Sequence, residues 1–434
     1  MSGVLTAEHG DARLVARDRA LPGLAALLNE DAFAEVLAKR LPTVEVRGAR
    51  ASYVRYKPGV SCLVAYHVEV AQPRGGDPVI AQIYGRAQRR DSPKLAKVQW
   101  RATAPSALGP GRLLVKDLHL AVYGFPNDRR LRSLARLCGT TDRPPLLMRL
   151  VPSDPALCRA SLRTLRYKPE RRYVAALVTG GRPRALLKAY DEGFGDAQRR
   201  AATLADMRLP LPRLIGGSRR HRVLVLEWLQ GDSLQGALEN GTWSGAGVTE
   251  AAGVLAALHS RRVDGLPSWS PSLEASKLRA AAEAVAVTLP DLEEPALQLA
   301  RRLGGDMSQT GRSGRLIHAD LSPDQVIISR DSSRIIDVDS AMCGPPGWDL
   351  ATFAAALERD VILGRVTTQV AEAVRDQFLG AYTRAAPMTV RLDDRLVAAA
   401  LLRLAPEPFR RRETDWTERT EAIVERVTEL AGNG

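Results

Sequence analysis

An internal repeat constrains the fold of this chain more than any other feature. The stretch VRYKPGVSCLVAY at 54–66 is echoed about 111 residues later by LRYKPERRYVAAL at 165–177. An apolar stretch follows each copy across a turn, VIAQIYG at 79–85 and ALLKAYD at 185–191. Short apolar runs separated by Pro- and Gly-containing turns predict strands, here an antiparallel meander written twice. Two copies are too few for a solenoid, so we expect a duplicated half-domain.

The two copies differ at one informative position in a simple alignment. Gln82 in the first copy aligns with Lys188 in the second, and Tyr84 aligns with Tyr190. A lysine within an apolar strand needs an anionic partner if it points inward, and otherwise it is an edge residue facing water. Because a glutamine cannot supply this charge, we interpret the first copy as degenerate.

The remaining patterns predict how the chain is divided. Residues 1–45 and most of the chain after 232 have helical periodicity, whereas 315–350 returns to β character. Strands first and helices later predict an α+β, two-lobe architecture. We expect an N-terminal α+β cap-like domain at 1–150, a strand-rich lobe at 151–231, and a helical lobe at 232–434 that carries the loop segment 315–350.

The segment RLIHADLSPDQVIISRDSSRIIDVDSA, from 315 to 341, carries the strongest chemical signal. Its His318-x-Asp320-x-x-x-x-Gln325 spacing is that of a kinase catalytic loop. A hairpin of VIIS and RII would bring Gln325 and Asp337 to one end, where two oxygen ligands suit Mg²⁺ beside a triphosphate. Asp320 would then orient an acceptor hydroxyl and accept its proton. The alternative is that these are hydrophilic loop residues between buried strands.

These motifs resemble the aminoglycoside phosphotransferase and choline kinase superfamily, small-molecule relatives of the protein kinases. That superfamily reads H-G-D-x-x-x-x-N, then I-D-x, then G-D-P-x-x-D-L, and this chain has IHADLSPDQVII, IIDVDSA and GPPGWDLA. The resemblance implies that Asp320 is the catalytic aspartate, that Gln325 and Asp337 bind the metal, and that Asp349 braces the catalytic loop. Ala319 replaces the usual Gly, and Gln325 the usual Asn, as in maltokinase-like members.

The resemblance also implies where ATP binds. Lys188 corresponds to the strand lysine that contacts the α- and β-phosphates. The stretch LEWL would form the hinge, where backbone groups near Glu227 and Leu229 hydrogen-bond adenine. The turn KPERR takes the place of a glycine-rich loop, with Arg171 and Arg172 either adding charge over the phosphates or simply facing solvent.

Several further residues carry narrower expectations. Asp339 would share a face with Asp337 if the chain continues extended, and would then lie beside the metal, although a solvated loop carboxylate is the other interpretation. The helix after Lys188 offers no Glu, only Asp196 and Asp206, as its ion-pair partner. Two more expectations concern packing: His259 is interpreted as a packed histidine, and Asn127 or Asp128 as the N-cap of a helix.

Composition limits the classes of partner and compartment. The formal charge is +13, but basic residues are spread along the chain and aromatics make up 5%, which does not favour nucleic acid as a partner. The sequence contains no run of 18 apolar residues, so it does not indicate a membrane span. The N-terminus lacks the pattern of a signal peptide, and the four cysteines form no C-x-x-C pair. We therefore expect a cytoplasmic protein with no disulfide framework.

Taken together, the sequence predicts an ATP- and Mg²⁺-dependent phosphotransferase with a small-molecule hydroxyl acceptor. The resemblance implies a sugar, aminocyclitol or antibiotic-like acceptor. Two alternatives remain open: a kinase of Ser/Thr in a peptide that the N-terminal domain docks, and a nucleotide-binding pseudokinase or scaffold. The sequence makes no prediction about oligomeric state or about the role of residues 1–150.

Overall fold

The structure is a computed structural model that describes residues 7–71, 77–93, 95, 103–205, 207–307, 314–329, 332–386 and 388–432. Asp206 and most of the turn AQPRGGDP lie outside these residues. The chain forms two compact units, one of residues 1–192, 216–225 and 408–418, and one of residues 193–215, 226–407 and 419–434. The predicted boundaries near 150 and 231 stay predictions.

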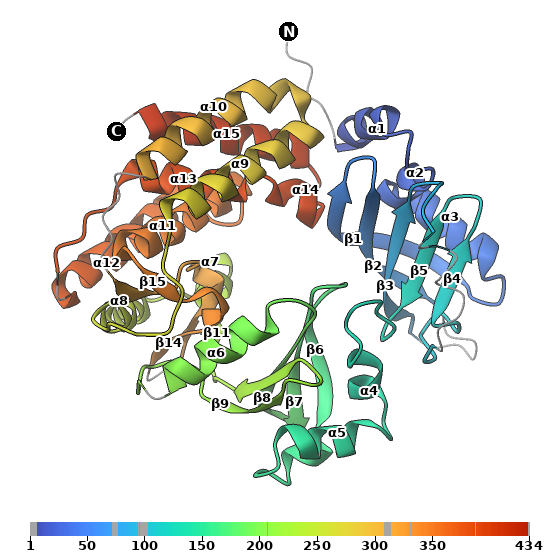
Figure 1. The fold of residues 1–434 in the computed structure, drawn as a ribbon, viewed down its shortest axis with the longest axis horizontal. Helices are drawn as coiled ribbons and strands as arrows, with labels where there is room; N and C mark the ends of the chain where they lie inside the picture. Colours follow the sequence, from blue (N-terminus) through green and yellow to red (C-terminus); the bar gives the residue numbers. More distant parts are fainter. Residues whose placement is uncertain are drawn as a thin grey trace. The chain divides into compact units, whose positions relative to one another are not determined.

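The repeat folds into two five-stranded antiparallel sheets of identical strand order (Figure 1). The first contains β1 (Val46–Lys57), β2 (Ser61–Val70), β3 (Val79–Gln88), β4 (Arg112–Val115) and β5 (Leu120–Gly124), in the order β1-β2-β3-β5-β4. The second contains β6 (Ser161–Lys168), β7 (Arg172–Thr179), β8 (Arg182–Tyr190), β9 (Leu214–Ser218) and β10 (Val223–Glu227), in the order β6-β7-β8-β10-β9. The predicted α+β fold, with an N-terminal domain that repeats the meander, is confirmed.

Strand register corrects our alignment of the two copies. Leu63 pairs with Arg86 across β2 and β3, and Val174 pairs with Lys188 across β7 and β8. Since Leu63 and Val174 are equivalent in the repeat, Arg86, and not Gln82, takes the place of Lys188. The turn before β3 is the longer one, and a slip of four residues preserves the in–out alternation of a strand, so the sequence pattern could not detect it. The first copy therefore does carry a cation at this position.

Short helices flank the two sheets. They are α1 (Ala7–Arg17), α2 (Leu24–Leu28), α3 (Glu30–Arg40), α4 (Leu134–Cys138) and α5 (Arg143–Leu150), with the 3₁₀ turn η2 (Leu157–Arg159). Phe33 of α3 stacks on Tyr66 of β2 with ring centroids 4.0 Å apart, and both rings are buried. Gly85 of β3 makes room for this packing, because a Cβ there would meet the side chain of Leu27 at 2.4 Å.

The segment after β5 differs from its prediction. The helix begins only at Leu134, and its cap position makes no side-chain hydrogen bond. Asp128 instead closes a tight turn, accepting hydrogen bonds from the amides of Arg130 and Leu131 at 2.7 and 2.8 Å. Asn127 bonds to the backbone of neighbouring loops. Neither residue is a helix N-cap, because the Asx turn forms at Asp128, five residues before the cap position Ser133.

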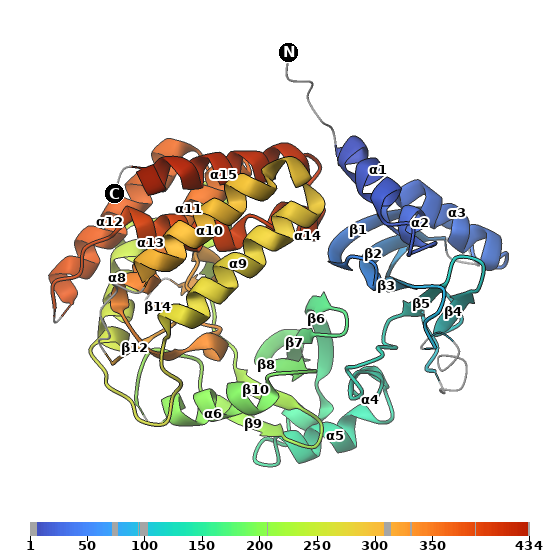
Figure 2. The same ribbon diagram turned by 45° about the horizontal axis from the view of Figure 1, so that its top comes forward.

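The second unit is mainly helical. Its longer elements are α6 (Phe194–Ala205), α8 (Gly245–His259), α9 (Pro271–Thr288), α10 (Glu293–Met307), α11 (Pro346–Ile362), α12 (Thr368–Ala385) and α13 (Asp394–Leu404). Shorter helices are α7 (Leu234–Glu239), η3 (Pro290–Leu292), η4 (Pro323–Gln325) and η5 (Val338–Ser340); α14 (Glu407–Arg411) and α15 (Trp416–Gly432) end the chain. Helices α9, α10 and α13 pack side by side (Figure 2), around a core that includes Leu278, Leu303 and Leu401.

Five short strands interrupt these helices. They are β11 (Asp232–Ser233), β12 (Arg315–Ile317), β13 (Val326–Ile328), β14 (Ser333–Ile335) and β15 (Met342–Gly344). Strand β13 pairs with β11 and β14, and β12 pairs with β15, all antiparallel. These ladders hold the loop that contains the catalytic motif. No helix among the described residues has the length and apolar character needed to cross a membrane.

Candidate active site

The predicted hairpin of the catalytic segment is present. Val326 of β13 pairs with Ile335 of β14, and the amide of Ile336 donates to the carbonyl of Gln325 at 2.9 Å. The ladder therefore places Gln325 next to the residue that precedes Asp337. This is the end at which the sequence predicted that the two would meet.

Asp349, in the first turn of α11, holds the catalytic loop. Its two carboxylate oxygens accept hydrogen bonds from the amides of His318 and Ala319 at 2.6 and 2.7 Å, and its side chain is fully buried. This is the brace that the resemblance implied. Ala319 has a φ of 70°, a region that favours glycine, which explains the residue usual in the family; alanine there costs about 1 kcal/mol. The bidentate brace sets the direction in which the next residue, Asp320, leaves the loop.

His259 supports the brace from α8. Its Nε2 lies 3.0 Å from Asp349 Oδ2 and its Nδ1 lies 2.7 Å from the Tyr382 hydroxyl, all in the buried core. Burial, and then the charge of Asp349, raise the pKa of Tyr382, so its hydroxyl stays protonated and donates to Nδ1. The Nε2–H of His259 then donates to Asp349. The interpretation of His259 as a packed histidine is confirmed.

His318 links the catalytic loop to the residue that follows strand β14. Its Nε2–H donates to the carbonyl of Ile336 at 2.9 Å, and the ring is fully buried. A single imidazole thus joins the residue two before Asp320 to the residue just before Asp337. The two carboxylates are positioned by the same rigid group.

Asp320, the residue after Ala319 in this loop, has an exposed side chain. Partial burial raises the pKa of its carboxyl, as does the nearby charge of Asp337, while Arg403 and His318 act in the opposite direction. Because the side chain remains 59% exposed, we expect water to moderate this rise.

Arg403, on α13, is a site residue that sequence reasoning missed. Its Nη2 lies 4.0 Å from Asp320 Oδ1, and its Nη1 donates to Glu274 Oε2 at 3.1 Å. Glu274 is almost fully buried, and the guanidinium lies over the Trp348 ring, 5.5 Å from its centroid. A fixed cation therefore stands beside the predicted catalytic carboxylate. No pattern marks it, because its partners lie on three other segments.

The backbone after Asp337 does not continue extended. Asp337 has a φ of 63°, and the following residues form the 3₁₀ turn η5. The premise that placed Asp339 on the same face as Asp337 is therefore wrong, because residues alternate across a strand but not around a 3₁₀ turn. A metal role for Asp339 stays a prediction.

Gln325 is the residue whose environment points most directly to a cation. Its Oε1 is buried and has no hydrogen-bond partner within the part of the chain that the structure describes. A buried amide oxygen without a donor is costly unless something positive binds it. Among the described residues no group of three or more His, Cys, Asp or Glu side chains could hold a metal.

Lys188 lies in the first unit, on β8. Its side chain is 4% exposed, so the alternative of an edge lysine facing water is wrong. Two aspartates were considered as the ion-pair partner of Lys188. Asp196 pairs with Arg199 on its own helix, and Asp206 is outside the described residues. Arg171 and Arg172, in the turn between β6 and β7, also belong to the first unit.

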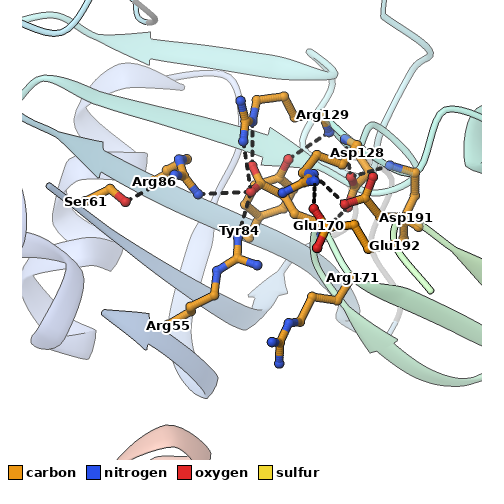
Figure 3. A network of polar contacts seen from close by, with 12 residues as sticks. Arg55, Ser61, Tyr84, Arg86, Asp128, Arg129, Glu170, Arg171, Asp191 and Glu192 are labelled. Carbon is orange, nitrogen blue, oxygen red and sulfur yellow. Dashed lines mark hydrogen bonds and ion pairs between the residues drawn. The ribbon is translucent and has the colours of Figure 1, made fainter. Parts of the chain in front are cut away.

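The tip of that turn is occupied by a buried acid (Figure 3). The Glu170 side chain is 0% exposed and accepts from Arg55 at 2.7 Å, Arg86 at 2.9 Å and Arg129 at 2.7 Å. Its amide donates to Asp128 Oδ2, and the amide of Arg171 donates to Lys168. Both amides are already hydrogen-bonded within the chain, so they are not available to bind the phosphates of ATP as the amides of a glycine-rich loop would. The turn is tied instead to the arginines of the first copy.

Glu170 titrates as the centre of this cluster. Burial by itself would raise the pKa of Glu170, but the hydrogen bond from Arg129 and the charges of the three arginines outweigh it and hold the pKa below its usual range. Burial lowers the pKa of Arg86, yet an arginine stays protonated far above neutral pH. The charge state of the cluster therefore follows Glu170.

The hinge residues that were predicted to bind adenine lie at and just after the end of strand β10. The amide of Glu227 donates to the carbonyl of Arg213 at 2.8 Å, and its carboxylate pairs with Arg213 and Arg334 at 3.3 and 3.4 Å. Leu229 follows in a segment without regular structure. The Glu227 amide is therefore engaged, which leaves its carbonyl and the Leu229 amide as the groups to consider for adenine.

Residues 161–392 match the model of a protein family described as "Phosphotransferase enzyme family". No curated protein matches the sequence significantly. This match covers the second meander and the catalytic segment.

Solved structures with a similar fold include choline kinase from Cryptosporidium parvum, at 12% identity and a TM-score of 0.45, covering 63% of this chain and 89% of that one. A thermostable mutant of aminoglycoside phosphotransferase APH(4)-Ia matches at 16% identity and 0.46, covering 63% and 95%. Aminoglycoside phosphotransferase APH(3'')-Id from Streptomyces rimosus matches at 17% and 0.42, covering 57% and 92%. With TM-scores below 0.5 these likenesses carry no further argument.

Proposed function

Because the chain belongs to the phosphotransferase enzyme family and is therefore a phosphotransferase, we propose that it transfers the γ-phosphate of ATP to a hydroxyl of a neutral, sugar-like small molecule. One observation carries the proposal. Asp349 hydrogen-bonds the loop that carries Asp320, and His318 joins this loop to Ile336, the residue before Asp337, beside a Gln325 Oε1 that has no hydrogen-bond partner among the described residues. This arrangement of one acceptor-side carboxylate and two metal-side oxygens is what in-line phosphoryl transfer needs.

Asp320 acts on the acceptor. Its carboxylate accepts a hydrogen bond from the acceptor hydroxyl, orients that oxygen toward the γ-phosphorus, and takes the proton as the new O–P bond forms and the bond to the β-phosphate oxygen breaks. Lys188 binds the α- and β-phosphates. Arg171 and Arg172 add positive charge beside them through their side chains. The carbonyl of Glu227 and the amide of Leu229 hold adenine.

Gln325 and Asp337 would hold Mg²⁺, with Asp339 as a further carboxylate close in sequence. These donors are all oxygens, which suits a hard cation, and the buried Gln325 Oε1 would gain the positive partner that it lacks among the described residues. When bound, Mg²⁺ neutralises charge on the β- and γ-phosphates. Gln keeps the amide oxygen of the usual Asn on a chain one methylene longer.

A thermal-shift series tests this arrangement. ATP with Mg²⁺ should stabilise the full chain more than ATP alone, by up to about 2.7 kcal/mol at a ligand concentration about 100 times Kd. Asp337→Asn should remove the Mg²⁺-dependent part, whereas Asp324→Asn, an exposed carboxylate on the same loop, should keep it. Stabilisation by ATP that does not depend on Mg²⁺ would favour the scaffold alternative and contradict the proposal.

Arg403 supports a neutral or anionic acceptor. Glu274 and Trp348 hold its guanidinium beside the Asp320 carboxylate, where the acceptor hydroxyl must approach. Two like unit charges about 4 Å apart repel by about 1 kcal/mol in water and about 4 kcal/mol near a protein surface. A polycationic aminoglycoside would meet this repulsion, whereas a sugar would not.

Arg403→Gln should therefore change acceptor preference. We expect the ratio of kcat/KM for a neutral sugar over that for an aminoglycoside to fall about tenfold, an energy of about 1.4 kcal/mol within the range for charges at this distance. Arg279→Gln, on the exposed side of α9, is the matched control and should leave the ratio unchanged. An unchanged ratio in Arg403→Gln would show that Arg403 does not select the acceptor.

The proposed compartment is the reducing cytoplasm. All four cysteines are free thiols, and burial raises the pKa of the Cys62 thiol to about 12. A thiol that stays protonated is slow to oxidise, and unpaired cysteines are typical of proteins kept under reducing conditions.

A further inference from the structure

A cavity in the first unit contains positive charge that the proposed phosphotransfer does not use. Its volume is about 850 Å³, which lies within the range of small-molecule sites. Its walls come from the β4–β5 region, the segment between β5 and α4, the end of β8 and the β9–β10 turn. Six lining residues are arginines: Arg112, Arg129, Arg130, Arg132, Arg220 and Arg222. Lys188, two residues before the lining residue Tyr190, is not part of the wall.

Among the described residues only two carboxylates line this cavity, and one of them is directed into the protein. Both oxygens of Asp128 accept hydrogen bonds. Oδ1 accepts from the amides of Arg130 at 2.7 Å and Leu131 at 2.8 Å. Oδ2 accepts from the Tyr167 hydroxyl and from the Glu170 amide, both at 2.8 Å. Four donors satisfy this carboxylate. Asp128 is therefore a structural acid that shapes the loop and offers little to neutralise the arginines.

The other carboxylate is shared between two arginines. Asp191 lies 2.5 Å from Arg130 and 3.5 Å from Arg222. Arg130 also pairs with Glu192, and Arg129 with the buried Glu170. Acidic partners thus compensate three of the six arginines.

Arg132 and Arg220 are the available cations. Both are exposed, and neither has an ion pair among the described residues. They stand on different walls, Arg132 before α4 and Arg220 in the β9–β10 turn. A ligand between these walls would therefore meet two guanidinium groups that need no rearrangement of existing ion pairs.

His221, next to Arg220, reports the same positive field. Burial, and then the charges of Arg136, Arg220 and Arg149, lower the pKa of its imidazole. Arg136 and Arg149 do not line the cavity. The positive potential therefore extends beyond the lining residues, and it disfavours a cation and favours an anion.

We propose that this cavity is a binding site for a small molecule with two or more phosphate groups, separate from the ATP site. Planar guanidinium groups match phosphate oxygens in pairs, and two uncompensated arginines from different segments of the wall suit two phosphates better than one. Arg129 contacts both the cavity and the Glu170 cluster at the β6–β7 turn (Figure 3), so a bound ligand acts close to that turn.

Isothermal titration of the full-length protein with inorganic pyrophosphate, without Mg²⁺, tests this site. We expect saturable binding of one molecule per chain, and at least about tenfold weaker binding in the double variant Arg132→Gln/Arg220→Gln, since each charged hydrogen bond contributes about 1.5–3 kcal/mol. The control Arg182→Gln/Arg184→Gln makes the same charge change at exposed positions of β8 in the same unit. It should bind pyrophosphate as the wild type does.

Two outcomes would overturn the proposal. One is the absence of saturable heat from the wild type at millimolar pyrophosphate. The other is an equal loss in both double variants, which would mean general charge attraction and no built site. If circular dichroism shows that the first double variant does not fold, the single variant Arg220→Gln takes its place, because the Arg220 side chain is exposed on a turn. Unchanged pyrophosphate binding in that single variant would also contradict the proposal.

Discussion

Asp320→Asn should lower kcat by about 10²–10⁴-fold, the usual contribution of a positioned general base. The amide keeps the size of the side chain and can still accept a hydrogen bond, but it cannot take the proton of the acceptor hydroxyl. The measurement is the steady-state rate of ADP release with the best acceptor. Binding of ATP, followed by thermal shift, should be unaffected, since Asp320 acts on the acceptor.

The matched control for this variant is Asp324→Asn. Asp324 lies on the same loop, is exposed, and hydrogen-bonds only with Ser322 among the side chains described. It should keep activity close to that of the wild type. Full turnover by Asp320→Asn would show that the reaction needs no carboxylate at this position and would invalidate the mechanism.

Glu170→Gln should strongly destabilise the protein. It removes one negative charge from the centre of three arginines, each within 2.9 Å of the carboxylate. Breaking a buried ion pair from one side costs about 3–5 kcal/mol, because the remaining charges stay desolvated. Urea unfolding at neutral pH measures this loss.

Two controls separate the charge from other effects at this position. Glu192→Gln removes a carboxylate that is 79% exposed and pairs with Arg130, and it should cost no more than about 1 kcal/mol. Glu170→Gly relieves the positive φ of 57°, and the equivalent residue of the first copy, at φ 61°, is Gly59. If Glu170→Gly were as stable as the wild type, the ion cluster would contribute no more than the relief of backbone strain, about 1 kcal/mol.

The pH dependence of the same cluster has a defined direction. The pKa of Glu170 is depressed in the folded state. Its stabilisation is therefore fully present above the ordinary glutamate pKa of about 4.3 and is lost as the pH falls through the lower folded-state value. The difference in stability between wild type and Glu170→Gln should shrink over that acidic interval.

Local patterns were enough to predict part of this fold. The duplicated meander and the hairpin that aligns Gln325 with Ile336 follow from short-range alternation, whereas the Asp349 brace was implied by the resemblance of the motifs to the superfamily. Strand alternation depends on neighbouring residues, so a single sequence contains it. The buried position of Lys188 was also within reach, because its strand is apolar on both sides.

What the sequence could not predict depends on long-range contacts or on register. Arg86 was missed because a slip of four residues preserves strand alternation. Glu170 was not singled out, because its three arginines come from segments 41 to 115 positions away. Arg403 is one of many arginines and is singled out only by its contacts with Glu274 and Trp348.

The most direct test of phosphotransfer is acceptor-dependent ADP release, screened across neutral sugars, aminoglycosides, nucleosides and Ser/Thr peptides with ATP and Mg²⁺. We predict that a neutral sugar raises ADP release above the rate with ATP alone, that removing Mg²⁺ abolishes the increase, and that Asp320→Asn suppresses it. Turnover with a peptide and not with any sugar would contradict the proposed acceptor, and release that no acceptor increases would contradict phosphotransfer itself.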